Sequence, residues 1–327
     1  IGEDFDTVNG NLFIKAYIPE VKNTPRQPGL RSNKRNKKLK RFDRLIEGEF
    51  VFHYDTSPLN KNISRLSPND QVIISSKLHG TSFITSLIPC KRRLSFWEKI
   101  KKFLGFKVQT TEYDNIYSSR KVIKNQYLCD NTAGYYETDV WGEANKIISP
   151  MLDKGMTVYA EIVGYQPGTS LYIQKNYDYG CNEGEFRIMP YRITTEQDPG
   201  GKKYEWDVSV VCEWTLKMQK NHPEQATRLM PLQIFYHGTL KDLYPDLDPA
   251  NHWHENLLGR LASDKNFYME QNEPLCKNKV PHEGIVIRID NDPINEAFKL
   301  KCNKFFEQEA KAIDKGEVDI ESLQEQA

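Results

Sequence analysis

A single lysine ends an apolar run in the stretch IISSKLHGTSFI, residues 73–84. A lysine amine is a nucleophile only when neutral, and its reference pKa of about 10.4 keeps it protonated at neutral pH. Burial at a strand end, together with nearby cations, would favour the neutral amine of Lys77. Gly80 would let the backbone turn tightly and approach a phosphate closely. Alone, this pattern also fits an exposed lysine in a hairpin turn.

Four further segments carry side chains suited to a nucleotide. Glu161 follows an apolar run, where its carboxylate could hold ribose hydroxyls. Glu283 begins the segment EGIVIR and suits a contact to a hard cation or its water. Lys299 and Lys301 are two residues apart, so they share a strand face and can meet one phosphate cluster. Arg120 follows two serines and can bind ribose or phosphate oxygens. Separately these residues fit capped strands and surface charges, but together they predict a nucleotide-phosphate site.

Short β-branched and aromatic segments, separated by Gly, Pro, Asn and Asp, predict the strands that position these residues. They are residues 11–19, 49–54, 71–77, 82–88, 156–165, 185–193, 204–214, 232–238, 283–290 and 297–301. Helices are predicted over 94–106, 141–152 and 305–326, and over 215–230 with a break at Pro223. The fold class is therefore α+β, with a largely antiparallel core and covering helices.

The helix over 94–106 has apolar residues on one face and lysines on the other. We expect its apolar face to pack on the sheet, and a helix lying on a membrane surface is the alternative.

Composition narrows the class of protein. The 327 residues include 45 basic and 45 acidic side chains, so net charge does not point to a polyanionic partner. The basic run 31–44 either binds phosphate backbones or forms a solvated loop. Six cysteines without a C-x-x-C pair argue against a zinc site and a disulfide scaffold, which favours an intracellular, cytoplasmic setting. No apolar run approaches the roughly 18 residues of a membrane span, so no membrane partner is predicted.

The order of these motifs resembles that of the covalent nucleotidyltransferases, and within them the ATP-dependent RNA ligases. The motifs are KLHG (Lys77–Gly80), SSR ending at Arg120, EIVG (Glu161–Gly164), MPYRI, EGIVIR from Glu283, and KLK (Lys299–Lys301). The resemblance covers about residues 52–305. His79 is typical of the RNA-ligase-2-like group, whereas DNA ligases and capping enzymes usually have Asp there.

The segment before KLHG resembles that of the Deinococcus-type nick-sealing RNA ligases, which carry an OB-like module. We therefore expect residues 1–48 to be a basic segment or the remnant of such a module. Residues 49–306 would form the antiparallel-sheet nucleotidyltransferase domain, an ATP-grasp-like ligase domain, and residues 307–327 a helical tail.

The resemblance implies an activity. Lys77 would take AMP from ATP, with Lys299, Lys301 and Mg²⁺ (or Mn²⁺) neutralising phosphate charge. AMP would pass to a 5′-phosphate end, and a 3′-hydroxyl would displace it, at nicks in RNA or RNA-containing duplexes. The basic run 31–44 and the lysines at 99–102 would contact the RNA backbone.

It also implies roles for the remaining residues. Arg120 and Glu161 would hold the ribose, Glu283 a metal ion, and Tyr191 the adenine, while His79 and Gly80 would lie at the nucleotide. Tyr191 also fits an ordinary half-buried strand tyrosine. Two departures stand out, because many relatives have Asn at the position of Ser82 and Asp at the position of Arg192. The alternatives are an ATP-dependent DNA ligase, a capping-type guanylyltransferase, and an RNA-binding protein of this fold without activity.

Overall fold

The computed structural model describes residues 7–8, 11–12, 43–124, 136–196, 200–290 and 296–314. Within these, the first residues form a small antiparallel pair, β1 (Thr7–Val8) with β2 (Asn11–Leu12). Most of the segment expected as an OB-like remnant, and of the strand predicted over 11–19, lies outside the described residues.

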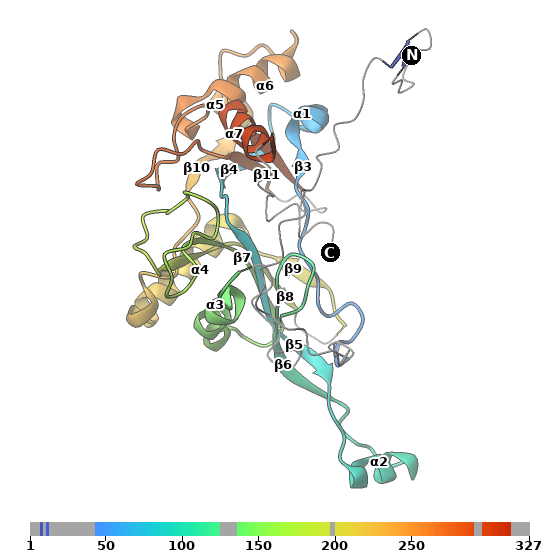
Figure 1. The fold of residues 1–327 in the computed structure, drawn as a ribbon. Coiled ribbons are helices and arrows are strands. Elements are labelled where there is room, and N and C mark those ends of the chain that lie inside the picture. Colours follow the sequence, from blue (N-terminus) through green and yellow to red (C-terminus); the bar gives the residue numbers. More distant parts are fainter. Residues whose placement is uncertain are drawn as a thin grey trace.

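Two five-stranded sheets, one above the other in Figure 1, carry the fold. The upper sheet is antiparallel apart from the parallel pair β12–β3. Its order is β10 (Ile234–Thr239), β4 (Gln71–Lys77), β11 (Gly284–Ile289), β12 (Ala297–Lys301) and β3 (Ser57–Pro58). The lower sheet is antiparallel throughout. Its order is β6 (Thr111–Ser118), β5 (Thr81–Lys91), β7 (Met156–Gly164), β8 (Phe186–Glu196) and β9 (Lys203–Glu205).

The chain passes from the upper to the lower sheet through residues 78–80, between β4 and β5. Lys77 is the last residue of β4 and therefore stands where the two sheets meet. The α+β class and the largely antiparallel core predicted from the sequence are confirmed for the described residues.

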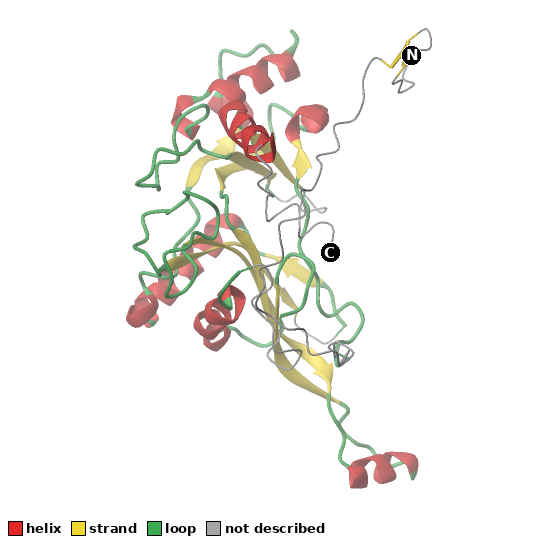
Figure 2. Cartoon of the chain, in the orientation of Figure 1, coloured by secondary structure: helices red, strands yellow, loops and turns green. Residues whose placement is uncertain are grey.

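Helices cover the outer faces of both sheets (Figure 2). In the upper part, buried residues of four helices join the core of that sheet: α1 (Leu59–Asn62), α5 (Leu240–Leu243), α6 (Trp253–Ser263) and α7 (Asn303–Asp314). In the lower part, α3 (Val140–Ile148) and α4 (Val208–Asn221) pack against the sheet.

Alternation along β7 separates core from site. Val158, Ala160 and Ile162 pack in the core beneath α3 and α4. Because successive strand side chains point to opposite faces, Glu161 points away from these helices and into the space between the sheets.

Several predicted elements differ from the structure. Residues 51–56 form no strand, although 49–54 were predicted as one. The strand predicted over 204–214 is wrong beyond Glu205, because α4 begins at Val208. Its buried residues Val208, Val211 and Thr215 recur at helical spacing, and their packing against β8 overrides the strand preference of valine. β6 and α6 were not predicted.

The predicted helices are confirmed only in part. The one over 141–152 forms as α3 and a following 3-10 turn, Ser149–Met151. The one over 215–230 is the end of α4, and Pro223 begins a separate 3-10 turn. α7 ends within the described residues at Asp314, and the rest of the predicted helix lies outside them.

The helix predicted over 94–106 forms as α2 (Phe96–Phe103), but it does not pack on the sheet. None of its residues is buried, and Figure 1 shows it beyond the end of the β5–β6 hairpin, away from both sheets. The expected packing is therefore wrong.

None of the helices that the structure describes has both the length and the apolar character needed to cross a bilayer.

Candidate active site

A cavity of about 270 Å³ lies between the two sheets, with walls from β4, β11 and β12 on one side and β5, β7 and β8 on the other. Its charged side chains are six cations and one carboxylate: Lys77, Arg120, Arg192, Arg288, Lys299, Lys301 and Glu161. A hollow with this excess of positive charge is suited to a ligand that carries several negative charges.

The register of three strands brings the predicted lysines together. In this register Gly284 of β11 is opposite Lys77 of β4 on one side and Lys301 of β12 on the other. The backbone of Gly284 has φ +142°, and a Cβ atom there would overlap the carbonyl oxygen of Leu300. Only glycine fits at this crowded point, so Gly284 holds the strands close enough for the two lysines to share one partner.

That shared partner is Glu283. Its Oε1 atom lies 2.6 Å from Nζ of Lys77 and 3.2 Å from Nζ of Lys301. Burial would raise the pKa of Glu283, but the two ammonium groups outweigh it and hold that pKa at about 2. Glu283 is therefore an anion with no solvent exposure, clamped between two cations.

The environment of Lys77 differs from the one expected. Burial and cationic neighbours were expected to favour its neutral amine, and Lys301 is indeed close by. A carboxylate at 2.6 Å, however, favours the ammonium form.

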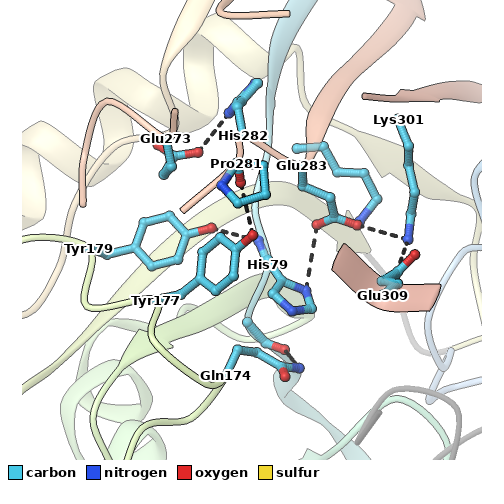
Figure 3. Close-up of polar contacts among 12 residues, drawn as sticks. His79, Gln174, Tyr177, Tyr179, Glu273, Pro281, His282, Glu283, Lys301 and Glu309 are labelled. Carbon is cyan, nitrogen blue, oxygen red and sulfur yellow. Dashed lines mark hydrogen bonds and ion pairs between the residues drawn. The ribbon is translucent and has the colours of Figure 1, made fainter. Parts of the chain in front are cut away.

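α7 completes the cluster. Oε1 of Glu309 lies 3.2 Å from Nζ of Lys301 (Figure 3). Burial raises the pKa of Glu309, and Lys301 opposes that rise. Lys301 therefore bridges two carboxylates, one directly before β11 and one on α7.

His79 lies behind Glu283 and is not part of the cavity wall. Its ring packs edge-on against Tyr177 and Phe305, with centroids 4.8 and 4.9 Å away. Its backbone N–H donates to the hydroxyl of Tyr179 at 2.7 Å, and Nδ1 lies 3.9 Å from Oε2 of Glu283 (Figure 3). In this structure His79 shapes the loop and supports Glu283.

Gly80 does not provide the tight turn expected of it, and its expected approach to a phosphate stays a prediction. Its φ lies outside the left-handed region, so the turn itself does not require glycine. A Cβ atom at this position would instead overlap the carbonyl oxygen of Ile162 in β7. The missing side chain lets the loop after Lys77 lie directly against β7.

Arg120 lies at the end of the hairpin strand β6, where its guanidinium donates to Oδ1 of Asp55 at 2.6 Å. This hydrogen bond lowers the pKa of Asp55. The sequence did not indicate Asp55, which lies between the cavity residues Tyr54 and Thr56.

Tyr191 lies on the cavity wall, and burial raises the pKa of its phenol, so the hydroxyl is neutral. Arg288 donates to the backbone oxygen of Tyr191 at 3.0 Å, and its guanidinium lies 5.9 Å from the ring centroid. These two contacts hold Tyr191 in place beside the cavity. The guanidinium of Arg192 donates from Nε to Oε1 of Glu205 at 2.8 Å.

His53 is a site residue that the sequence did not indicate. Its Nδ1 lies 3.1 Å from the hydroxyl of Tyr191 and 3.4 Å from Oγ of Ser82. Burial and the nearby charge of Arg120 lower the pKa of His53 to about 3. At neutral pH this side chain is a neutral polar group.

A divalent cation in this cavity would need phosphate oxygens of a bound ligand to complete its coordination. Among the described residues, no group of three or more His, Cys, Asp or Glu side chains is arranged to hold a metal ion. The carboxylates within reach are Glu161 on the wall and Glu283 behind the lysines. Mg²⁺ is usually held by one or two carboxylates together with phosphate oxygens, so these residues fit such an ion once a phosphate ligand is bound.

We compared this chain with protein-family models, with curated proteins and with solved structures, and only the solved structures gave matches. No model of a protein family matches the sequence, and no curated protein matches it. Among solved structures, a mutant RNA ligase of Naegleria gruberi with ATP and Mn is similar over 80% of this chain and 59% of its own, with 13% identity and a TM-score of 0.45. Another mutant of the same ligase with ATP and Mn is similar over 81% of this chain and 59% of its own, with 12% identity and a TM-score of 0.46.

The same ligase with pyrophosphate is similar over 81% of this chain and 60% of its own, at 14% identity and a TM-score of 0.44. The chain thus spans about three fifths of the length of these structures.

Proposed function

We propose that this chain is an ATP-dependent RNA ligase in which Lys77 forms a covalent bond to AMP. The observation that carries this proposal is the position of Lys77. It ends a buried strand, lies on the wall of a cation-rich cavity, and shares the carboxylate of Glu283 with Lys301. The motif order described above supplies the choice of ATP and RNA.

In the first step the lone pair of Lys77 Nζ forms a bond to the α-phosphorus of ATP. The bond from that phosphorus to the oxygen bridging to the β-phosphate breaks, and pyrophosphate leaves with the electron pair. The amine gives up a proton to water, and the product is a lysyl-AMP phosphoramidate. Such transfers depend mainly on positioning and on neutralising charge.

Release of Lys77 from Glu283 is the step that the cluster controls. While Glu283 contacts Lys77, it stabilises the ammonium, which cannot attack. If the carboxylate turns away when phosphates enter, Lys77 is left beside the cation of Lys301, and the neutral amine becomes favoured. Glu283 thus holds the nucleophile inactive until the nucleotide binds.

The other wall residues would bind the nucleotide. Lys299 and Lys301 share a face of β12 and would contact the phosphates. Arg120 and Glu161 would hold the ribose, and Tyr191 would stack on adenine, with His53 fixing its hydroxyl. A bound Mg²⁺ or Mn²⁺ would supply further neutralisation of phosphate charge.

Two later steps would complete ligation. A 5′-phosphate oxygen of one strand end attacks the phosphorus of lysyl-AMP, which frees Lys77 and gives an adenylylated end. A 3′-hydroxyl then attacks the 5′-phosphate, forms the phosphodiester and expels AMP. A nick in a duplex that contains RNA is the substrate we propose, recognised by A-form shape and 2′-hydroxyls. The basic run 31–44, most of it outside the described residues, would contact the backbone.

The test is mass spectrometry of the purified protein after incubation with ATP and Mg²⁺. We expect one AMP on Lys77, no adduct in Lys77→Ala, and a full adduct in the control Lys146→Ala, which alters an exposed lysine on α3. An adduct that persists in Lys77→Ala would refute the assigned nucleophile.

The same protein separates the alternatives. Labelling from GTP but not ATP would indicate a capping-type guanylyltransferase, and no labelling would indicate a binding protein without activity. Equal sealing of all-DNA nicks and of nicks with RNA on the 3′-hydroxyl side would count against RNA specificity and favour the DNA-ligase alternative.

A further inference from the structure

α2 is a well-formed helix with no partner in the described chain. Ser95 caps its N-terminus, because its hydroxyl accepts from the N–H of Glu98 while the Glu98 carboxylate accepts from the N–H of Ser95. Gly105, with φ +82°, follows its last turn. The helix is therefore locally stable although none of its residues is buried.

Its exposed side chains are unusually apolar. The five most exposed large apolar side chains in the described residues all lie in or next to α2: Phe103 at 89%, Phe96 and Trp97 at 71%, Phe106 at 64% and Leu104 at 63%. Isolated exposed apolar residues are ordinary, but a contiguous group of this kind marks a surface that binds something.

Helical geometry places four of these five side chains, all except Phe106, on one side of α2 together with Ile100. Successive residues are about 100° apart, so Phe96, Trp97, Ile100, Phe103 and Leu104 fall within about a third of the circumference. Lys99 and Lys101 lie just outside the two edges of this apolar face. Lys102 lies on the opposite side, beside Glu98.

Charge around the helix has one dominant sign. Residues 91–107 contain seven Lys or Arg and one acid, Glu98, in a chain whose net charge is zero. Arg92 already contacts Glu98. The other six basic residues of 91–107 therefore concentrate positive charge around the apolar face of α2.

We propose that α2 lies in the surface of an anionic lipid bilayer and anchors the protein there. Trp97 and the phenylalanines would enter the boundary between headgroups and acyl chains, where Trp is favoured. Lys99 and Lys101, at the edges of the apolar face, would reach up to the anionic headgroups. The hairpin holds the helix away from both sheets, so a flat surface can meet it without a clash with the body (Figure 1).

An RNA backbone fits this surface less well. Lysines match phosphates, and single aromatic rings can stack on bases, but Ile100 and Leu104 have no stacking role. A contiguous face of aromatic and aliphatic side chains gains most from an apolar environment. We therefore assign the lysines of α2 to lipid headgroups in place of the RNA contact expected from the sequence.

The experiment is flotation of the full chain with vesicles. One set is phosphatidylcholine alone, and the other is an equal mixture of phosphatidylcholine and phosphatidylserine. We expect binding to the anionic set, weakened at least about tenfold in the double variant Trp97→Glu/Phe103→Glu. The matched control Leu216→Glu alters an exposed apolar residue of α4 and should bind like the parent.

Fluorescence tests insertion. The variant Trp97→Phe keeps the apolar face, so it should still bind vesicles. The blue shift of tryptophan emission on vesicle binding should be smaller in this variant than in the parent. AMP labelling without vesicles should be unchanged in the double variant, so the anchor and the proposed ligase activity can fail separately.

Three results would overturn the proposal. The first is a parent protein that does not bind anionic vesicles, and the second is a double variant that binds them as well as the parent. The third is loss of RNA binding or of self-association in the double variant without any vesicle binding, because either loss would assign this face to RNA or to a second copy.

Discussion

Nζ of Lys77 lies 2.6 Å from Oε1 of Glu283, and this carboxylate has no solvent exposure. Lys301 contacts the same oxygen at 3.2 Å. One buried anion thus separates two cations that would otherwise repel each other. Because strand register fixes all three residues, the state of Glu283 decides the state of Lys77.

Glu283→Gln tests this relationship. The amide keeps the shape but removes the charge between two cations, so we expect the free energy of unfolding at pH 7 to fall by about 3 kcal/mol. The amine of Lys77 should then lose its proton more readily, and the pH profile of AMP labelling should move to lower pH. A profile that does not move would contradict the holding role of Glu283.

Lys301→Ala tests the second cation. We expect the rate of AMP labelling of Lys77 to fall by about 10²-fold, because phosphate charge loses a fixed partner. Lys311→Ala is the matched control on α7, where an exposed lysine is removed. Single-turnover labelling with ATP measures both, and an unchanged rate in Lys301→Ala would remove this lysine from the first step.

Gly80→Ala tests the close approach of the loop to β7. The added methyl would overlap the carbonyl oxygen of Ile162, so we expect a loss of roughly 2 kcal/mol of stability in urea unfolding. Gly259→Ala provides the comparison, because nothing lies within 4 Å of its added Cβ in α6. That helical substitution should stabilise by up to about 1 kcal/mol. Similar effects at both positions would argue against the crowding at Gly80.

His53 predicts a pH dependence of stability. Its pKa is about 3 in the folded protein and ordinarily about 6.5, so the unfolded chain binds a proton first as pH falls. Its neutral form therefore supports the fold fully above pH 6.5, and this support declines as the pH falls toward 3. By pH 5 the loss is up to about 2 kcal/mol.

His53→Gln should lose less stability than the parent between pH 7 and pH 5, since glutamine does not titrate. Urea unfolding at both pH values measures the difference, and the other titrating groups cancel in the comparison. Equal losses in the two proteins would show that His53 titrates normally.

The strands that carry the motif lysines and glutamates could be predicted because their patterns are local. β4, β7 and β12 are short runs of β-branched and apolar residues that end at Lys77, Gly164 and Lys301. The alternation rule also placed Lys299 and Lys301 on one face, and both line the cavity.

Residues brought in by tertiary contact could not be predicted this way. His53 belongs to a segment without regular structure, and no spacing in the sequence relates it to Tyr191. Arg288 faces the cavity because β11 pairs with β4 in one particular register. The contacts of Glu283 with Lys77 and Lys301 could not be predicted for the same reason, since these two lysines come from different strands, β4 and β12.

The row formed by Lys77, Gly284 and Lys301 limits how this chain can change in length. Strand side chains alternate, so one residue inserted within β11 would turn Val286 and Arg288 to the opposite face and break the match with both neighbouring strands. Every motif letter would still be present in such a sequence. A one-residue shift of register inside the six-residue strand β11 would therefore disrupt the proposed active site as fully as loss of Lys77 itself.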